Sequence, residues 1–349
     1  MNPIGTGTSF AIQGLPLHTV PNETMTTPRR FLLPLLAGFL AGGCTSSKTP
    51  DPPRLDPTPA TNVPASASTM RPAGASVALA SPRFTPSDYE SHVVELRKRF
   101  PLDRFHVFVQ PPFVVVGDEP EEQVRLRADQ VVRWAVSLLK KDYFSQDPEH
   151  ILTIWLFADD SSYRTHAKAF FGDAPSTPYG YYSARHKALV MNIGTGGGTL
   201  VHELVHPFME ANFPACPAWF NEGLGSLYEA SREHDGHIWG LTNWRLPALQ
   251  QGIREGRLPS FERLLAMTDD QFYGEDSGTN YAQARYLCYF LQEKGLLVAF
   301  YRAFVSGHAD DPTGVNTLRR VLGTTDLVAF QKQWEAFVLG LRFPQPPLE

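Results

Sequence analysis

Two histidines spaced four residues apart, His202 and His206, constrain this chain more than any other feature. On a helix, side chains at positions i and i+4 lie on the same face, so both imidazoles can reach one metal ion. Glu203 is displaced around the helix, where it is better placed to hold a metal-bound water than to act as a third ligand. The pattern H-E-x-x-H therefore predicts a helix with two zinc ligands and a general base. The alternative is a helix with two ordinary polar histidines.

A catalytic zinc site normally has three protein ligands, so another ligand must come from elsewhere in the chain. The next strong signal is the largely apolar segment around Glu222, which follows His206 after 15 residues. The intervening prolines, at positions 207, 214 and 217, should end the first helix and turn the chain, and a second helix should start near Ala218. From that helix Glu222 would project back toward the histidines. Alternatively, it is a charged first-turn residue favoured by the helix dipole.

The segments around these residues resemble a known family. They are a strand-like segment 188–193, a glycine loop 194–198, H-E-L-V-H-P from residue 202, and W-F-N-E-G followed by L-Y-E within 219–229. Together they look like the gluzincin branch of zinc metallopeptidases, and most closely like the peptidase-MA-like proteins of bacterial envelopes. The resemblance implies one zinc ion held by His202, His206 and Glu222, with Glu203 as the base. It covers about residues 180–349 in the order of elements, but its specific motifs lie only in 199–229. The interval to Glu222 is shorter than in the best-known secreted gluzincins, which bears on pocket shape and substrate more than on metal binding.

The first 44 residues have the features of a processing segment. Two arginines precede an apolar run over 31–43, which has the length of a signal-peptide core and is short for a membrane span. Small residues then lead to Cys44 and resemble the lipobox of bacterial lipoproteins, so Cys44 is the predicted lipidation site. An ordinary secretory signal is the alternative, and Met25 would make a conventional start.

Composition divides the rest of the chain at residue 82. Residues 45–82 contain 8 prolines in 38 residues with many Ser, Thr and Ala, a composition that predicts a disordered tether. Residues 83–349 form the predicted catalytic domain, with a sheet-containing part over 83–212 and a helical part over 213–349. A net charge of −5 and the lack of a long basic tract give no case for nucleic-acid binding.

Apolar periodicity predicts the elements of this domain. Helices are expected over 86–100, 121–143 and 161–171, strands over 106–110, 113–116, 151–157 and 187–193, and, after the zinc helix, further helices over 244–255, 259–267, 281–294, 296–306, 313–322 and 326–341. This order predicts an α+β fold: a small mixed sheet with covering helices, then the HExxH helix and a mostly helical C-terminal subdomain, a zincin-like arrangement. Strand 187–193 would lie at the rim of the cleft as an exposed edge for an extended peptide, or else be an ordinary sheet strand.

Several further residues are candidates for supporting roles. Tyr281 is the first candidate for donating a hydrogen bond to an oxyanion, because it opens a predicted helix after a polar, glycine-containing loop. Its alternative role is packing at a helix start. Ser226 and Glu229, one and two turns beyond the third ligand, are candidates for orienting a ligand histidine, with solvated or capping roles equally open. Cys216 and Cys288 either form a disulfide or remain separate buried thiols.

The resemblance and the targeting signals together predict a membrane-anchored, extracytoplasmic zinc endopeptidase of the bacterial cell envelope that acts on a peptide or protein. Glu203 would take the proton of a zinc-activated water and pass it to the leaving amine. Two alternatives stay open. One is a non-catalytic envelope protein, with structural zinc or none, that binds a peptide or a cell-wall component, and the other is a zinc amidase acting on a non-peptide amide. The sequence defines neither the cleaved bond nor the oligomeric state.

Overall fold

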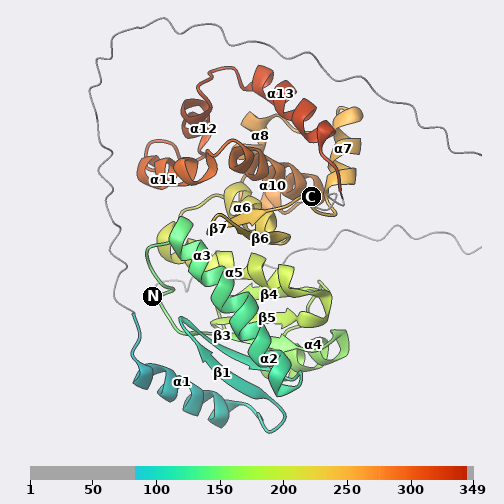
Figure 1. The fold of residues 1–349 in the computed structure, drawn as a ribbon. Coiled ribbons are helices and arrows are strands. Elements are labelled where there is room, and N and C mark those ends of the chain that lie inside the picture. The colour runs from blue at the N-terminus through green and yellow to red at the C-terminus, as the bar shows by residue number, and fades with distance from the viewer. Residues whose placement is uncertain (1–82, 275, 344–349) are drawn as a thin grey trace, which may run out of the picture. The chain divides into compact units, whose positions relative to one another are not determined.

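A five-stranded mixed sheet is the central element of the fold (Figure 1). The structure, a computed structural model, describes residues 83–274 and 276–343. The strands, in their order across the sheet, are β1 (His106–Gln110), β2 (Phe113–Gly117), β3 (Leu152–Phe157), β5 (Ala188–Asn192) and β4 (Gly180–Ser183). The three interior strands run parallel, and β1 and β4 pair antiparallel with them at the two edges. The interior strands are buried along their whole length, which explains their nearly continuous apolar sequences.

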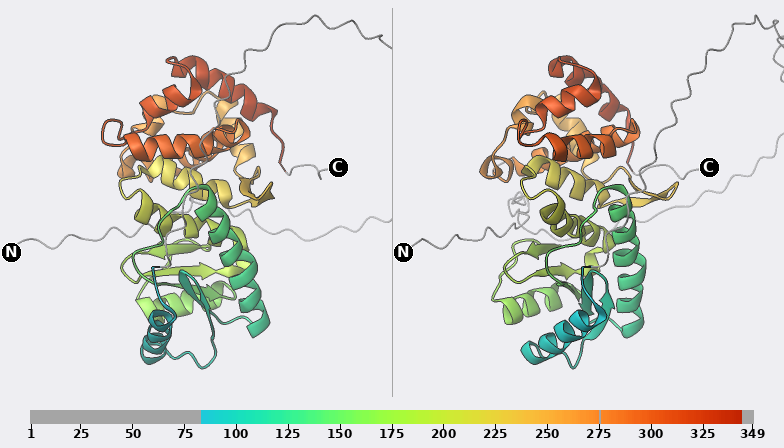
Figure 2. Two further views of the ribbon diagram at one scale, coloured as in Figure 1. Left: turned by 60° about the vertical axis from the view of Figure 1, so that its left-hand side comes forward. Right: turned by 90° about the vertical axis from the view of Figure 1, so that its left-hand side faces the viewer.

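The two faces of the sheet enter separate hydrophobic cores, because successive side chains of a strand point to opposite sides. In β3, Ile154 belongs to one core and Trp155 to the other. The Ile154 face is covered by α2, α3 and α5, and the Trp155 face by α1 and α4 (Figure 2). These helices are α1 (Pro86–Arg99), α2 (Glu121–Leu126), α3 (Trp134–Asp142), α4 (Asp160–His166) and α5 (Gly197–Asn212), with π-helical segments at Arg127–Arg133 and Ala167–Phe171 and a 3-10 turn at Ile193–Thr195.

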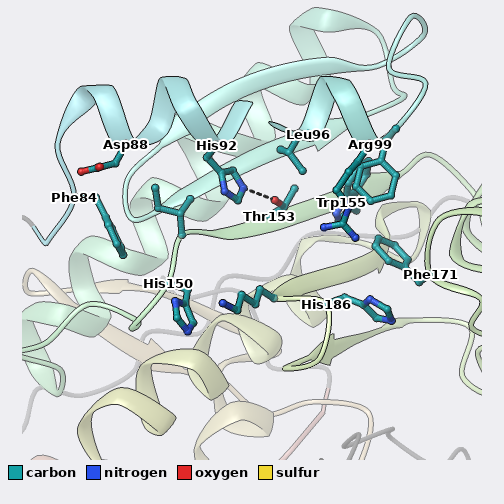
Figure 3. Close-up of a pocket in the computed structure, with 13 residues that line it drawn as sticks. Phe84, Asp88, His92, Leu96, Arg99, His150, Thr153, Trp155, Phe171 and His186 are labelled. Carbon is teal, nitrogen blue, oxygen red and sulfur yellow. Dashed lines mark hydrogen bonds between the residues drawn. The ribbon is translucent and has the colours of Figure 1, made fainter. Parts of the chain in front are cut away.

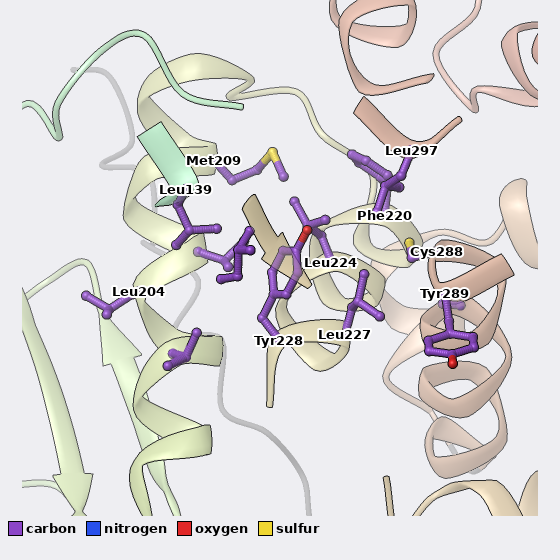
Figure 4. Close-up of a cluster of buried hydrophobic side chains, with 14 of the residues drawn as sticks. Leu139, Leu204, Met209, Phe220, Leu224, Leu227, Tyr228, Cys288, Tyr289 and Leu297 are labelled. Atoms are coloured by element: carbon purple, nitrogen blue, oxygen red, sulfur yellow. The ribbon is translucent and has the colours of Figure 1, made fainter. Parts of the chain in front are cut away.

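The C-terminal part is built around α10 (Ser277–Glu293), which is buried on nearly all sides, as expected of a helix inside a core. Between α5 and α10 lies α6 (Ala218–Tyr228), whose Leu224, Leu227 and Tyr228 fill the space between them (Figure 4). The remaining elements are β6 (Ser231–His234), β7 (His237–Gly240), α7 (Leu246–Arg254), α8 (Phe261–Leu265), α9 (Asp269–Phe272), α11 (Leu297–Gly307), α12 (Val315–Leu322) and α13 (Leu327–Gly340). The helix that carries Glu222 is thus held from both sides.

The predicted α+β fold, with a small mixed sheet and covering helices, is confirmed. Each predicted helix and strand is present within a few residues of its expected bounds. Three features were not predicted: strand β4, the hairpin of β6 and β7, and helix α9. Each of these elements has only 4 residues, too few for a hydrophobic period to identify.

The first ligand helix ends within the segment of prolines, as predicted: α5 stops at Asn212, just before Pro214, and Pro207 lies inside the helix. A proline inside a helix costs about 3 kcal/mol. Phe208 and Met209, which follow it, are buried in the main core, and burying each side chain contributes roughly 1.5–3 kcal/mol. Tertiary packing therefore outweighs the proline. The second ligand helix begins at Ala218, as predicted.

The expectation that strand 187–193 forms an exposed edge is wrong, because β5 lies between β3 and β4. The alternative, an ordinary sheet strand, describes it correctly. The edge on this side of the sheet is β4, which reaches β5 through a turn over residues 184–187. A ligand that adds a strand here would pair with β4.

Some predictions concern residues that the structure does not describe. The signal segment, the lipidation site Cys44 and the tether over 45–82 all lie outside the described residues. No helix in the described part of the chain has the length and apolar character needed to cross a membrane. Cys216 is half-buried and Cys288 is buried, and both are free thiols, so the disulfide alternative does not hold in this structure.

Candidate metal centre

His202, His206 and Glu222 meet where α5 packs against α6. The two histidines lie on one face of α5 with their ring centroids 4.9 Å apart, as the i, i+4 spacing predicts. Oε2 of Glu222 lies 3.1 Å from Nε2 of His202 and 3.9 Å from Nε2 of His206. Two helices therefore bring three donor atoms to one point.

The separations of these three atoms suit a zinc ion. A tetrahedral site with bonds of roughly 2.0–2.1 Å places its donor atoms about 3.3 Å apart. The distances from the Glu222 oxygen to the two imidazole nitrogens, 3.1 and 3.9 Å, bracket that value. Imidazole nitrogen and carboxylate oxygen are common zinc donors. The chemistry and the spacing of the donors thus fit the metal that the resemblance implies.

Glu203 is a second carboxylate beside the same histidines. Its Oε2 is 4.0 Å from Nε2 of His206, and donor atoms of His202, Glu203 and His206 all lie within 4.8 Å of one another. Glu222 is the better third ligand, because a single oxygen approaches both imidazoles more closely. This leaves Glu203 next to the donors without making it a ligand.

The environment of Glu203 suits a group that accepts and returns a proton. Its side chain is 2% exposed, and Oε1 has no hydrogen-bond partner among the described residues. Burial raises the pKa of Glu203, and the positive charges of His202 and His206 oppose that rise. A carboxylate with a raised pKa is a more effective base near neutral pH than an ordinary exposed one.

Opposite charges balance one another within the ligand set. Burial alone would raise the pKa of Glu222, but the charge of His206 and the hydrogen bond from His202 hold the pKa below its usual range. Burial would likewise lower the pKa of His202, yet the carboxylates of Glu222 and Glu229 raise it. An isolated charge at this depth would be costly, so the groups stabilise one another. Because ligand histidines are neutral, metal binding here would release protons.

Each ligand histidine also has a partner at its Nδ1 atom. Nδ1 of His206 lies 3.0 Å from Oδ1 of Asn221 and donates to it, which leaves Nε2 free to bind a metal. Nδ1 of His202 lies 3.3 Å from Oε1 of Glu229, close enough for an ion pair although outside hydrogen-bond geometry. Partners of this kind fix the orientation of the ring and raise its basicity as a ligand.

Glu229 is held in turn by the loop before α7. Arg245 donates to both of its oxygens, at 2.9 and 3.3 Å, and Asn243 Nδ2 donates at 3.0 Å. Of the two candidates for orienting a histidine, Glu229 lies against His202, whereas the buried Ser226 hydroxyl has no hydrogen-bond partner among the described residues. Sequence reasoning missed Asn221, Asn243 and Arg245. The position of Asn221 directly before the third ligand was a usable signal, but nothing in the sequence marks the loop.

Two tyrosines approach the third ligand. The Tyr273 hydroxyl donates to Oε1 of Glu222 at 2.8 Å, and no sequence pattern indicated this contact. Tyr281 lies in the second turn of α10, which begins at Ser277 and not at the tyrosine as expected. Its side chain is buried, and its hydroxyl makes no hydrogen bond of good geometry with the residues that the structure describes. Burial, and then the negative charge of Glu222, raise the pKa of Tyr281, so the hydroxyl stays protonated and can donate.

Small residues allow the two ligand helices to come close together. A β-carbon at Gly225 would lie 3.2 Å from Nε2 of His202. At Gly198, in the first turn of α5, it would lie 2.0 Å from the carbonyl oxygen of Glu229, a separation that real atoms do not adopt. Glycine is therefore required at Gly198 for the start of the HExxH helix to contact the end of α6.

The edge strand β4 passes beside the centre. The Tyr182 hydroxyl donates to Glu210 of α5 at 2.8 Å, and the Tyr182 backbone N–H is close enough to act on the Glu203 carboxylate. The donors themselves are enclosed: the side chain of His202 is 0% exposed, that of Glu222 is 3% and that of His206 is 10%. His206 is therefore the most accessible of the three.

The structure thus brings four predicted site residues together, His202, Glu203, His206 and Glu222, and sets Tyr281 near them. Comparison of the sequence with protein-family models and with curated proteins finds no match to either. The function must accordingly be argued from the geometry of the centre and from the motifs that form it.

Proposed function

We propose that this protein is a zinc-dependent endopeptidase with a zincin-like catalytic domain. The observation that carries the proposal is the approach of one Glu222 oxygen to both His202 and His206, with the buried Glu203 beside them. Three ligands and one base are the protein groups that metal-assisted hydrolysis requires. A purely structural zinc site has no need of Glu203. The motifs shared with gluzincins support the same activity.

The chemistry assigns a separate task to each group. A zinc ion held by the three ligands would supply a Lewis acid that polarises a carbonyl and makes water more acidic. Glu203 would take the proton of the attacking water and then deliver it to the leaving amine, as its raised pKa permits. The Tyr281 hydroxyl is our candidate donor to the developing oxyanion. A Tyr281→Phe variant with full turnover and normal zinc content would exclude that role.

We assign the binding of an extended substrate to β4. This strand is at the edge of the sheet, so one side of its backbone is not paired with another strand. Main-chain hydrogen bonds to such an edge hold peptides without demanding a particular side chain. The position of Tyr182 beside Glu203 supports the assignment, because a peptide on β4 would pass close to the base.

The location that we propose is the outer side of a bacterial membrane, with a lipid anchor on Cys44. The support is in the sequence: an apolar run over 31–43, small residues before the cysteine, and a proline-rich segment over 45–82. An anchored endopeptidase of this kind would act on peptides or proteins of the cell envelope.

The first experiment measures zinc content and hydrolysis of a peptide library, with the parent and Glu203→Gln side by side. Both proteins should bind one zinc ion, and turnover in the variant should fall by about 10²–10⁴-fold because the base is lost. Glu90→Gln is the matched control, since it removes an exposed carboxylate from α1, on the face of the sheet opposite α5, and it should retain zinc and activity. Equal turnover in parent and Glu203→Gln would exclude the base, and a parent without zinc would exclude the site.

One observation favours a second function, that of a non-catalytic zinc protein. The donor side chains are no more than 10% exposed, so a substrate has little access to them in this structure, and a structural zinc needs no such access. In that case the parent and Glu203→Gln would each bind one zinc ion, and neither would hydrolyse any peptide. Both would bind peptides or cell-wall fragments without cleaving them. A parent that cleaves only cell-wall fragments would instead identify a zinc amidase acting on a non-peptide bond.

A further inference from the structure

A cavity of about 420 Å³ lies on the Trp155 face of the sheet, the face opposite α5 (Figure 3). Its walls come from four separate segments: α1 with its flanking residues, the start of β3, the end of the π-helical segment Ala167–Phe171 and the turn between β4 and β5. In Figure 3, His92, Leu96 and Arg99 project from α1 on one side, and His150 and His186 lie on the other. Its volume is within the range of small-molecule sites.

The lining of this cavity combines aromatic and apolar side chains with polar ones. Trp155, only 1% exposed, lies beneath its surface, and the ring centroids of Phe100 and Phe171 lie 4.9 and 5.7 Å from it, both in edge-to-face contact. One polar pair is set into this surface, the hydrogen bond of 2.8 Å between Nε2 of His92 and Oγ1 of Thr153. Aromatic walls with a few fixed polar groups are typical of pockets that bind a flat organic body.

The rim carries positive charge that the protein does not neutralise. Arg99 and Lys187 line the cavity, and within the described residues neither makes an ion pair. Arg99 instead lies over the Phe100 ring, 5.1 Å from its centroid. Asp88 is the one carboxylate among the described lining residues, and it caps α1 by accepting two hydrogen bonds of 2.7 Å from Thr85.

The backbone of Lys187 is held in an unusual conformation. Its φ of 52° lies in the left-handed region, which is unfavourable for a residue other than glycine. Two backbone hydrogen bonds fix it there: its N–H donates to Ala184 at 3.3 Å, and its carbonyl accepts from Thr153 at 3.1 Å. A lysine rather than a glycine in this conformation adds a cation to the rim of the cavity. This observation is independent of the aromatic lining.

We propose that the cavity binds a small organic anion. A flat apolar body would lie against the half-buried Phe171 ring, above the buried Trp155, and its carboxylate or phosphate group would be held between Arg99 and Lys187. Charge-assisted hydrogen bonds to these two cations would supply selectivity for the anion, and the aromatic lining would supply affinity for the body. The site is separate from the proposed peptidase centre and does not depend on it.

The test uses the full chain and three probes: 2-naphthoate, its neutral analogue 2-naphthamide, and acetate. Titration calorimetry should give 1:1 binding of 2-naphthoate at least about tenfold tighter than of either other probe. If 2-naphthoate binds no more tightly than 2-naphthamide, the proposal that the cavity selects an anion is overturned. A further experiment measures binding to anionic phospholipid vesicles. If the protein binds these vesicles but not 2-naphthoate, the proposal that the ligand is a free small molecule is overturned.

Variants locate the binding. Arg99→Gln with Lys187→Gln should remove the preference for 2-naphthoate over 2-naphthamide, and Phe171→Ala should weaken both of these probes. Lys98→Gln is the matched control, because Lys98 is on the same helix, is 68% exposed on its side chain and does not line the cavity. Circular dichroism establishes that each variant folds. Loss of preference in Lys98→Gln, or an unchanged preference in the double variant, would contradict the proposed location.

Discussion

The two faces of the sheet differ in whether their charged groups have partners within the protein. On the Ile154 side, each imidazole of the metal centre lies against a carboxylate or an amide, and the Glu229 carboxylate is itself held by Arg245 and Asn243. On the Trp155 side, Arg99 and Lys187 stand at the rim of a cavity without ion-pair partners among the described residues. The groups of the metal centre are therefore held in place by the protein itself. The cations of the cavity rim lack a counter-charge, which a ligand can supply.

This difference indicates where substitutions should be costly. Groups held by several neighbours in a buried place lose the stabilisation of all of them when one partner is removed. Exposed cations without partners have little to lose within the protein itself. Variants of the metal centre should therefore change metal binding strongly, and variants of the cavity rim should change only the binding of a ligand.

The largest effect is expected from Glu222→Gln. The amide keeps the size of the side chain but removes the charge that approaches both imidazoles, so zinc affinity should fall by more than the 10–100-fold typical of an outer partner. Competition with a zinc-binding dye measures the affinity, and Glu90→Gln again serves as the exposed control. A greater loss in Glu203→Gln than in Glu222→Gln would show that Glu203 is the third ligand and would reverse the assigned roles.

Sequence reasoning succeeded where one helical period determined the geometry. The i, i+4 spacing placed both histidines on one face of α5, and the long apolar segments gave the strands and helices within a few residues. It failed where tertiary contacts decide. The sequence does not indicate which of the three prolines ends α5, because burial of Phe208 and Met209 lets the helix continue past Pro207. The edge of the sheet is formed by a strand of only 4 residues, β4, which no hydrophobic period identifies.

The supporting partners of the centre show the same limit. Asn221 is adjacent in sequence to the third ligand and could be found from helix spacing. Tyr273, Asn243 and Arg245 reach the centre from short elements or loops whose positions depend on the packing of the whole helical part. No local pattern encodes such contacts. The predictions for Cys44 and the tether lie outside the described residues and stay predictions.

A smaller effect is expected from Glu229→Gln, which removes the charge opposite Nδ1 of His202. Zinc affinity should fall by about 10–100-fold, the usual effect of losing the partner of a ligand histidine. The change also leaves Arg245 without its ion pair, so stability must be separated from metal binding. Arg245→Gln provides this separation, because it breaks the same pair but keeps the carboxylate. If both variants lose zinc affinity equally, Glu229 acts through the packing of the loop and not on His202.

The smallest effect is expected for Arg99→Gln and Lys187→Gln, when zinc content and stability are measured. Both side chains belong to exposed residues without ion pairs in the described structure, and such substitutions change stability by about 0.5 kcal/mol or less. For a domain of this size the melting temperature should therefore move by no more than about 2 °C, and zinc content should be unchanged. Scanning calorimetry and metal analysis of the two variants measure both quantities. A loss of zinc in either variant would mean that the two faces are coupled through β3 and β5, whose side chains enter both cores, and the contrast between them would no longer hold.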